Sequence, residues 1–196
     1  MKTESGPVSA VAPVPWPTET LWAEAQATLR HSLAMNAARL APARRLAAAI
    51  AHHRACLAAL FDAVAEITCA VCTTPCCQHA KVWLDFTDLL FLHLNRVPLP
   101  PRQLRGDLNA PCRFLGPQGC RLPHQTRPWI CDWYICPDLQ RAIARDIPGG
   151  WVQVERIRAR VKSRRDAMEA AYLKVVAYGV TIPLKVGKGV GREQQK

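Results

Sequence analysis

The chain has 196 residues, 49% of them apolar and 21% charged, which suits one domain with a buried core and excludes a wholly disordered protein. No stretch reaches the ~20 uncharged apolar residues of a membrane span, and prolines interrupt the N-terminal region where a secretory signal would need an apolar run. We therefore expect a cytoplasmic protein without a membrane partner. The net charge is +11, and residues 141–196 hold most of it, with 13 basic and 5 acidic side chains.

Residues 1–17 are rich in Pro, Val and Ala, so we expect a flexible arm there. Thr18 or Thr20 can cap a first helix, because apolar residues recur at helical spacing directly after them. A second, alanine-rich helix is expected from about Pro42 to Thr68. Both helices belong to one predicted helical domain over residues 18–178.

The middle segment, residues 69–140, has a different composition, with cysteines, prolines and glycines in short turns. One helix is expected inside it, from about Thr87 to Asn95, with Thr87 as its cap. This helix is apolar almost all round, which predicts burial on several sides. We interpret Asp85 and Asp88 as cap and surface charges.

A long helix is expected from about Trp151 to Tyr178, with Gly179 at its C-cap and a loose basic tail over residues 179–196. The predicted fold is mostly α, with helices from both termini packing around a loop-rich, cysteine-rich metal-binding module. The basic surplus near the C-terminus suits either an anionic partner or an ordinary solvated helix face.

Cysteine is the residue type that points most directly to function. There are nine, an odd number, and eight of them lie between Cys69 and Cys136. In a reducing compartment such density is typical of metal ligation and not of a disulfide framework. Burial as a small apolar side chain is the favoured interpretation for Cys56 alone.

The first cysteine cluster is Cys69, Cys72, Cys76 and Cys77. A Cys-x2-Cys step lets two thiolates converge on one centre from a tight turn, as in many zinc and iron–sulfur sites. Adjacent cysteines in an extended segment point to opposite sides, so Cys76 and Cys77 are expected to face different centres or one multinuclear cluster.

The second cluster is Cys112, Cys120, Cys131 and Cys136. The Gly-Pro-Gln-Gly turn at 116–119 predicts a hairpin that brings Cys112 and Cys120 together. Closing the loop between the two clusters costs a few kcal/mol, whereas a structural zinc site contributes ~10–16 kcal/mol. Metal can therefore hold this region folded, and the charge balance is acceptable for zinc and for an iron–sulfur cluster alike.

The order Cys-x2-Cys-x3-Cys-Cys, an apolar helix, Cys-x-Phe-Leu, Gly-Cys and Thr-Arg-Pro-x2-Cys resembles the YkgJ-type cysteine-cluster proteins, described as zinc- or iron-chelating domains. Flagellin lysine methylases carry a similar cysteine set with an iron–sulfur cluster. The resemblance covers roughly residues 69–140. It implies these metal ligands: Cys69, Cys72, Cys76, Cys77, Cys112, Cys120, Cys131 and Cys136.

Arg127 and Trp129 are predicted to lie at the cofactor. Arg127 is expected either to bind backbone carbonyls around the cluster or to stabilise its sulfurs, the alternative being an ordinary surface arginine. Trp129, with Trp133 and Tyr134, is expected to form an apolar lid. His79 and His124 lie next to ligand cysteines and either replace one or serve as loop histidines.

These features predict a protein that binds an iron–sulfur cluster or zinc in a structural, redox or cofactor-carrying role. Two alternatives stay open. One is a cluster-dependent protein-modifying enzyme, similar to a methyltransferase or an oxidase, with an unidentified protein as partner or substrate. The less favoured one is a nucleic-acid-binding zinc protein, which the basic C-terminal quarter suggests.

Overall fold

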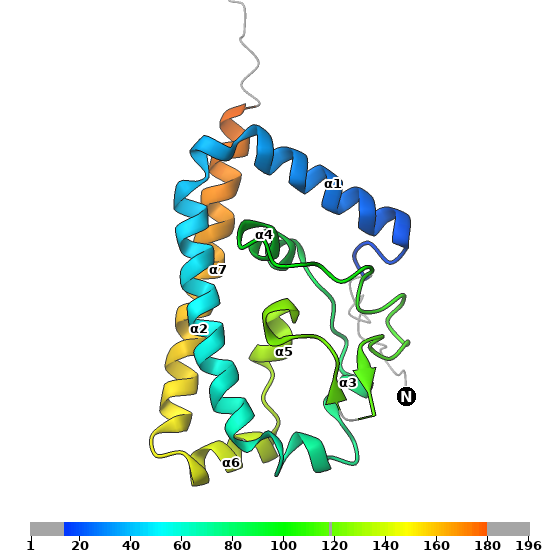
Figure 1. The fold of residues 1–196 in the computed structure, drawn as a ribbon, viewed down its shortest axis with the longest axis vertical. Helices are drawn as coiled ribbons and strands as arrows, with labels where there is room; N and C mark the ends of the chain where they lie inside the picture. The colour runs from blue at the N-terminus through cyan, green and yellow to red at the C-terminus, as the bar shows by residue number, and fades with distance from the viewer. Residues whose placement is uncertain (1–13, 118, 180–196) are drawn as a thin grey trace, which may run out of the picture.

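The computed structural model describes residues 14–117 and 119–179, and it is mostly helical (Figure 1). The α-helices are α1 (Glu19–Met35), α2 (Ala41–Ala65), α3 (Cys76–His79), α4 (Phe86–Leu94), α5 (Trp129–Trp133), α6 (Pro137–Asp146) and α7 (Gly150–Gly179). Shorter elements are the 3₁₀ helices η1 (Ala37–Arg39), η2 (Cys69–Val71) and η3 (His124–Thr126), and the strands β1 (Leu115–Gly116) and β2 (Gly119–Cys120).

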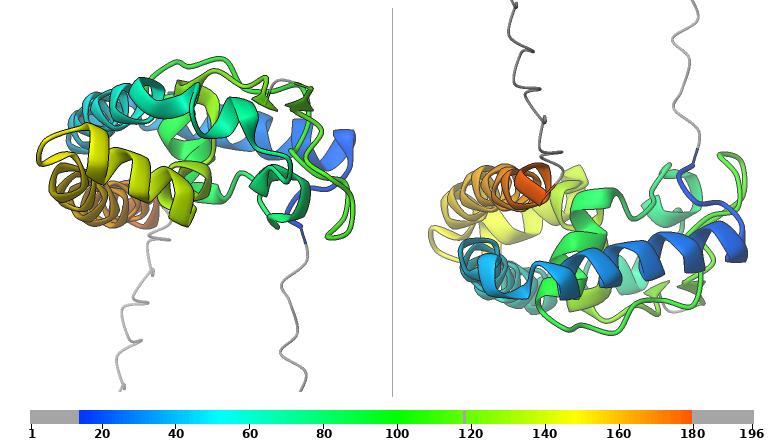
Figure 2. Two further views of the ribbon diagram at one scale, coloured as in Figure 1. Left: turned by 90° about the horizontal axis from the view of Figure 1, so that it is seen from below. Right: turned by 90° about the horizontal axis from the view of Figure 1, so that it is seen from above.

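Two long helices, α2 and α7, lie side by side and form one wall of the molecule (Figures 1 and 2). Ala43 and Ala47 of α2 are buried, and the Ala47 carbonyl accepts from the side-chain amide of Asn95, directly after α4, at 3.2 Å. Val154, Val161 and Met168 of α7 are fully buried in the same core. The helix expected from Trp151 to Tyr178 is thus confirmed in position and length.

All the shorter elements lie on one side of this wall, between α1 at one end and α6 at the other (Figure 1). Helix α4 is at the centre of this side, and Leu89, Leu90 and Leu92 are almost completely buried, as its all-round apolar sequence predicts. The cap of α4 is Asp85, not Thr87: Asp85 and Asp88 form a capping box, in which Asp85 Oδ1 accepts from the Asp88 N–H at 2.7 Å.

Part of the expected N-terminal arm packs against the domain. Val14 is buried, and the Trp16 ring lies 6.1 Å from that of Trp22. Trp22 in turn donates its indole N–H to the Pro100 carbonyl at 3.0 Å. Residues 1–13 of the expected arm and residues 180–196 of the expected basic tail lie outside the described residues.

Helix α6 was not expected from the sequence. It begins at Pro137, a residue well suited to the first helical turn, and Cys136 serves as its N-cap. The side chains of Leu139 and Ile143, on one side of α6, are buried, and α6 packs against α2. It therefore closes the core beside the second cysteine cluster.

Helix α2 is long and apolar enough, by length and composition alone, to cross a membrane. It is not a run of ~20 uncharged apolar residues, because it contains three arginines and an aspartate. The core helix of a soluble protein passes the same test, so one such helix is weak evidence. Here α2 packs along α7, and a charged residue, Arg54, is buried on its apolar side.

Candidate functional site

The predicted ligand cysteines differ in exposure. Cys112 is buried, Cys120, Cys131 and Cys136 are half-buried, and Cys69, Cys72 and Cys76 are exposed. The side chain of Cys77 lies outside the described residues. The second cluster is thus built into the core, whereas the first lies at the surface.

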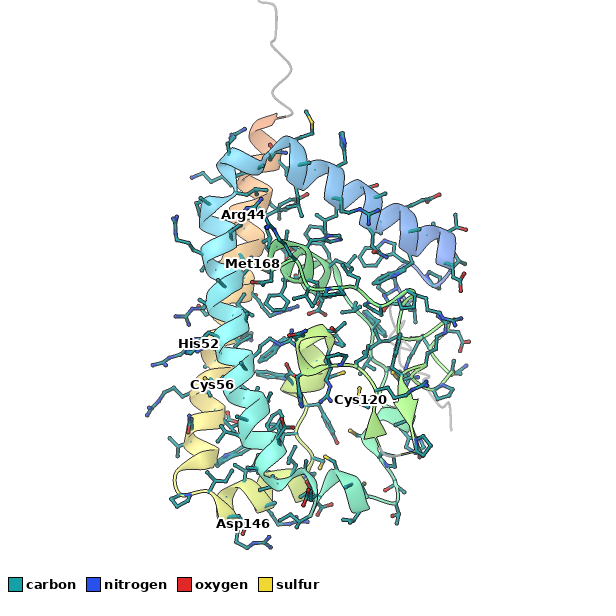
Figure 3. All side chains as sticks on the ribbon, viewed as in Figure 1. Arg44, His52, Cys56, Cys120, Asp146 and Met168 are labelled. Carbon is teal, nitrogen blue, oxygen red and sulfur yellow. The ribbon has the colours of Figure 1, made fainter. Side chains whose placement is uncertain are left out.

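The hairpin expected around the second cluster is present. Strands β1 and β2 are antiparallel with Leu115 opposite Cys120, and Gly119 at the turn has a φ of +104°, a conformation that favours glycine. The Leu115 N–H also bonds to the Cys112 carbonyl at 3.1 Å. Cys112 and Cys120 therefore lie on neighbouring backbone segments. Figure 3 shows Cys120, the last residue of β2, on the side of the hairpin that faces α5.

The first cluster consists of two short helical turns. Cys69 begins η2, and the Cys72 N–H bonds back to the Cys69 carbonyl at 3.4 Å. Cys76 and Cys77 begin α3 instead of an extended segment. The extended backbone assumed for these two residues from the sequence is therefore not present.

Cys131 and Cys136 do not share a helix. Cys131 is in α5, whereas the Cys136 sulfur caps α6 by accepting from the Leu139 N–H at 3.4 Å. Across the residues whose side chains are described, which leave out Cys77, no three His, Cys, Asp or Glu side chains form a group that could hold a metal ion. Convergence of all eight sulfurs thus stays a prediction.

A buried arginine ties α2 to the segment before Cys131. Arg54 is 5% exposed and pairs with Asp132 at 2.7 Å between Nε and Oδ2. Its Nη2 donates to the Arg127 carbonyl at 2.7 Å and to the His124 carbonyl at 3.3 Å, and its guanidinium carbon lies 5.1 Å from the Phe91 ring centroid. Burial raises the pKa of Asp132, and the charge of Arg54 opposes this shift.

The sequence interpretation missed Arg54, although it carries a signal. It lies four residues after Ile50 and three before Leu57, so it stands in the apolar stripe of α2, where a charge needs a buried partner. That partner is Asp132, the residue after Cys131 in α5.

Arg127 makes local contacts. Its Nε donates to the Leu122 carbonyl at 3.1 Å, and its Nη1 lies 3.1 Å from Nδ1 of His124. The other ring nitrogen of His124 is 3.0 Å from Asp62 of α2. The structure thus shows one of the roles expected for Arg127. It donates to a backbone carbonyl, that of Leu122, which is two residues after Cys120.

A second buried arginine, Arg105, was also missed. It is 1% exposed, and its Nη1 donates to the Leu108 and Ala110 carbonyls, yet its Nε and Nη2 have no hydrogen-bond partner in the described structure. The Arg113 N–H closes this loop on the Leu104 carbonyl at 2.9 Å. Arg105 and the buried Cys112 are therefore the first and last residues of the loop that this hydrogen bond closes.

On the side of α5 towards α7 there is a cavity of about 400 Å³, lined by Asp85, Trp129, Ile130, Trp133, Lys162, Arg165 and Asp166. The Trp129 and Trp133 rings are 6.0 Å apart, and the Arg158 guanidinium carbon lies 4.0 Å from the Trp133 ring centroid. The two tryptophans of the expected lid thus lie against a cavity and α7, and Tyr134 is exposed.

An aspartate behind this cavity is completely buried. Asp88 accepts from the Trp129 N–H at 3.0 Å and from Arg165 at 2.5 Å, and Arg165 also contacts Asp85 at 3.1 Å. Burial raises the pKa of Asp88 to about 6, although Arg165 acts in the opposite direction. The interpretation of Asp88 as a surface charge was wrong, because Asp88 joins α4, α5 and α7.

Comparison of the chain with protein-family models, with curated proteins and with solved structures finds no match. The resemblance to the YkgJ-type proteins is therefore still a prediction, and it depends on the order and spacing of the cysteines.

Proposed function

We propose that this protein binds an iron–sulfur cluster or zinc through the cysteines of residues 69–136. The donor atoms are thiolate sulfurs, which zinc and iron–sulfur centres prefer. These cysteines lie in short helices, turns and a hairpin with two residues in each strand. Such elements have little apolar surface of their own to hold them together. Zinc would supply cross-links between them, and an iron–sulfur cluster would add redox chemistry.

The observation that carries the proposal is the buried guanidinium of Arg105. A buried guanidinium with two nitrogens that make no hydrogen bond is unfavourable, and the one acidic group on which Arg105 is seen to act, Asp107, is itself fully exposed. Arg105 and Cys112 flank the same backbone closure, so a thiolate centre that includes Cys112 would supply negative charge in that region. Neither zinc nor an iron–sulfur cluster fully neutralises four thiolates, and the site would therefore suit a basic neighbour.

The test is metal analysis of protein purified without oxygen. We expect stoichiometric iron or zinc, and for iron a broad absorption band in the visible region that bleaches on reduction. Cys112→Ser should lower the metal content, whereas Cys56→Ser should leave it unchanged, because Cys56 lies on α2 outside the two clusters. Metal-free protein that is fully folded would overturn the proposal.

A second candidate function is a cluster-dependent enzyme that modifies a protein, and the cavity beside Trp129 favours it. The helix that lines the cavity also carries Cys131, so a small cosubstrate bound there would lie against the cysteine module. Native mass spectrometry of the anaerobic protein should then detect a retained molecule such as S-adenosylmethionine. Trp129→Ala should release this molecule without loss of metal. If the purified protein neither retains such a molecule nor binds it when it is added, this candidate is contradicted.

A further inference from the structure

A basic surface runs along the line where α2 and α7 lie side by side, and we call it the α2–α7 seam. Its residues are Arg45, His52 and His53 of α2 and Arg156, Arg160 and Arg164 of α7. The three arginines of α7 are four residues apart, so they follow one face of the helix over roughly 12 Å. In Figure 3, His52 lies on the edge of α2 away from α4 and α5.

His53 shows that the two helices bring these charges together. Its pKa is lowered first by burial and then by the charges of Arg164, His52 and Arg160. The rings of His52 and His53 are 5.6 Å apart. The charged groups that act on His53 are all basic, and they place Arg160 and Arg164 of α7 close to the histidines of α2. The lowered pKa keeps His53 itself mostly neutral at neutral pH, so the arginines supply the positive charge of the seam.

The acidic residues of the same two helices lie elsewhere. Each is next to a partner away from the seam or lines the cavity: Asp62 beside His124, Glu155 beside Arg158, Glu169 beside Thr87, and Asp166 at the cavity. Within the described structure, Arg156, Arg160 and Arg164 take part in no salt bridge. No acidic side chain therefore compensates the positive charge of these three arginines, whereas Arg165 pairs with Asp85 and Asp88.

We propose that the α2–α7 seam binds the phosphate backbone of duplex DNA. A row of guanidinium groups matches a row of phosphates, because each guanidinium can donate two parallel hydrogen bonds to phosphate oxygens. A membrane surface fits less well, since no large apolar side chain is exposed between Arg156 and Arg164 to insert among lipids. Binding of this kind is independent of sequence and falls steeply with salt.

The test is fluorescence anisotropy of a labelled duplex of about 20 base pairs, from about 50 to about 200 mM KCl. The intact chain should bind, and the logarithm of its affinity should fall linearly with the logarithm of the salt concentration. The triple variant Arg156→Gln/Arg160→Gln/Arg164→Gln should bind roughly tenfold or more weakly, with a salt slope smaller by about 2–3, one unit per lost phosphate contact.

The matched control removes the same charge elsewhere, in Arg30→Gln/Arg102→Gln/Arg141→Gln, which are exposed residues of α1, of the loop after α4 and of α6. All proteins keep residues 180–196, and circular dichroism checks that each is folded. The control should bind almost as the intact chain does. Equal weakening by both triple variants, an absence of DNA binding, or binding to phosphatidylglycerol vesicles in preference to DNA would overturn the proposal.

Discussion

At the residue scale, the stability of the site depends on charges that are buried in pairs. Arg54 and Asp132 are both nearly inaccessible, and Arg54 also satisfies two backbone carbonyls of the loop that leads to Cys131. A buried pair contributes little net free energy compared with apolar residues, but removal of one member leaves the other charge uncompensated. The role of Arg54 is therefore to fix the position of the 124–132 segment on α2.

Arg54→Met should destabilise the protein by ~3–5 kcal/mol, because the Asp132 carboxylate would stay buried without its partner. Arg54→Met/Asp132→Leu should recover part of this loss, since it replaces the pair with apolar side chains. Urea unfolding of both variants at neutral pH measures the difference. If the double variant were as unstable as the single one, the cost would come from the lost carbonyl contacts and not from the buried charge.

Asp88 should make stability depend on pH in the opposite sense to most aspartates. Its pKa in the folded protein, about 6, is above the ordinary value of 3.8, so the folded state holds the proton more tightly than the unfolded state does. The stabilisation from this proton is complete below about pH 4 and is lost as the pH rises through about 6.

The test compares the intact chain with Asp88→Asn. The free energy of unfolding of the intact chain, minus that of the variant, should fall by on the order of 3 kcal/mol between about pH 4 and about pH 7. The comparison removes the contribution of titrating groups that do not interact with Asp88; Asp85, whose charge acts on Asp88, is not one of them. A difference that grew with pH would mean that Arg165 keeps Asp88 charged in the folded state.

At the scale of elements, Gln103 fastens three segments together. Its Oε1 accepts from the Leu84 and Leu104 N–H groups at 2.9 and 3.0 Å, and its Nε2 donates to the Leu84 and Pro15 carbonyls at 3.0 and 3.1 Å. The side chain is fully buried, and all of its hydrogen-bonding capacity is used. It therefore holds the entry to α4 and the segment before α1 on the same loop.

Gln103→Leu should cost ~2–4 kcal/mol, because it leaves buried backbone groups of Leu84 and Leu104 without partners. Gln140→Leu is the matched control, since Gln140 is exposed on α6, and it should change stability by less than ~0.5 kcal/mol. Thermal unfolding followed by circular dichroism compares the two. Equal effects would show that the hydrogen bonds of Gln103 contribute nothing beyond its volume.

The long helices α1, α2 and α7 could be predicted from the sequence, because they have apolar residues at helical spacing over several turns, and α4 could be predicted from its almost continuous apolar sequence. The hairpin between Cys112 and Cys120 could be predicted from its Gly-Pro-Gln-Gly turn. Helix α6 could not, since it has few large apolar residues and its cap is a cysteine in place of the usual serine or aspartate. The roles of Arg54 and Asp88 depend on contacts between segments that are far apart in the chain, and local patterns do not report these.

At the scale of the whole molecule, two regions have different sources of stability. The wall of α2 and α7, with α4 against it, contains most of the fully buried apolar side chains. The cysteine-bearing turns, the hairpin and α5 lie to one side of that wall and contribute few such side chains (Figure 1). If metal supplies the missing stability, the two regions should respond differently to its removal.

Hydrogen exchange after chelation under reducing conditions tests this difference. Amides in residues 69–136 outside α4 should lose protection, because a structural metal site contributes ~10–16 kcal/mol to the folding of small modules. Amides of α2 and α7 should stay protected, and the far-ultraviolet ellipticity should change little, since these two helices pack mainly against each other, although α2 also contacts α5 and η3. Cys56→Ser should give the same pattern, as Cys56 is outside both clusters. Unchanged protection throughout the chain after complete metal removal would mean that the module is held by its own packing and by Arg54, Arg105 and Gln103 alone.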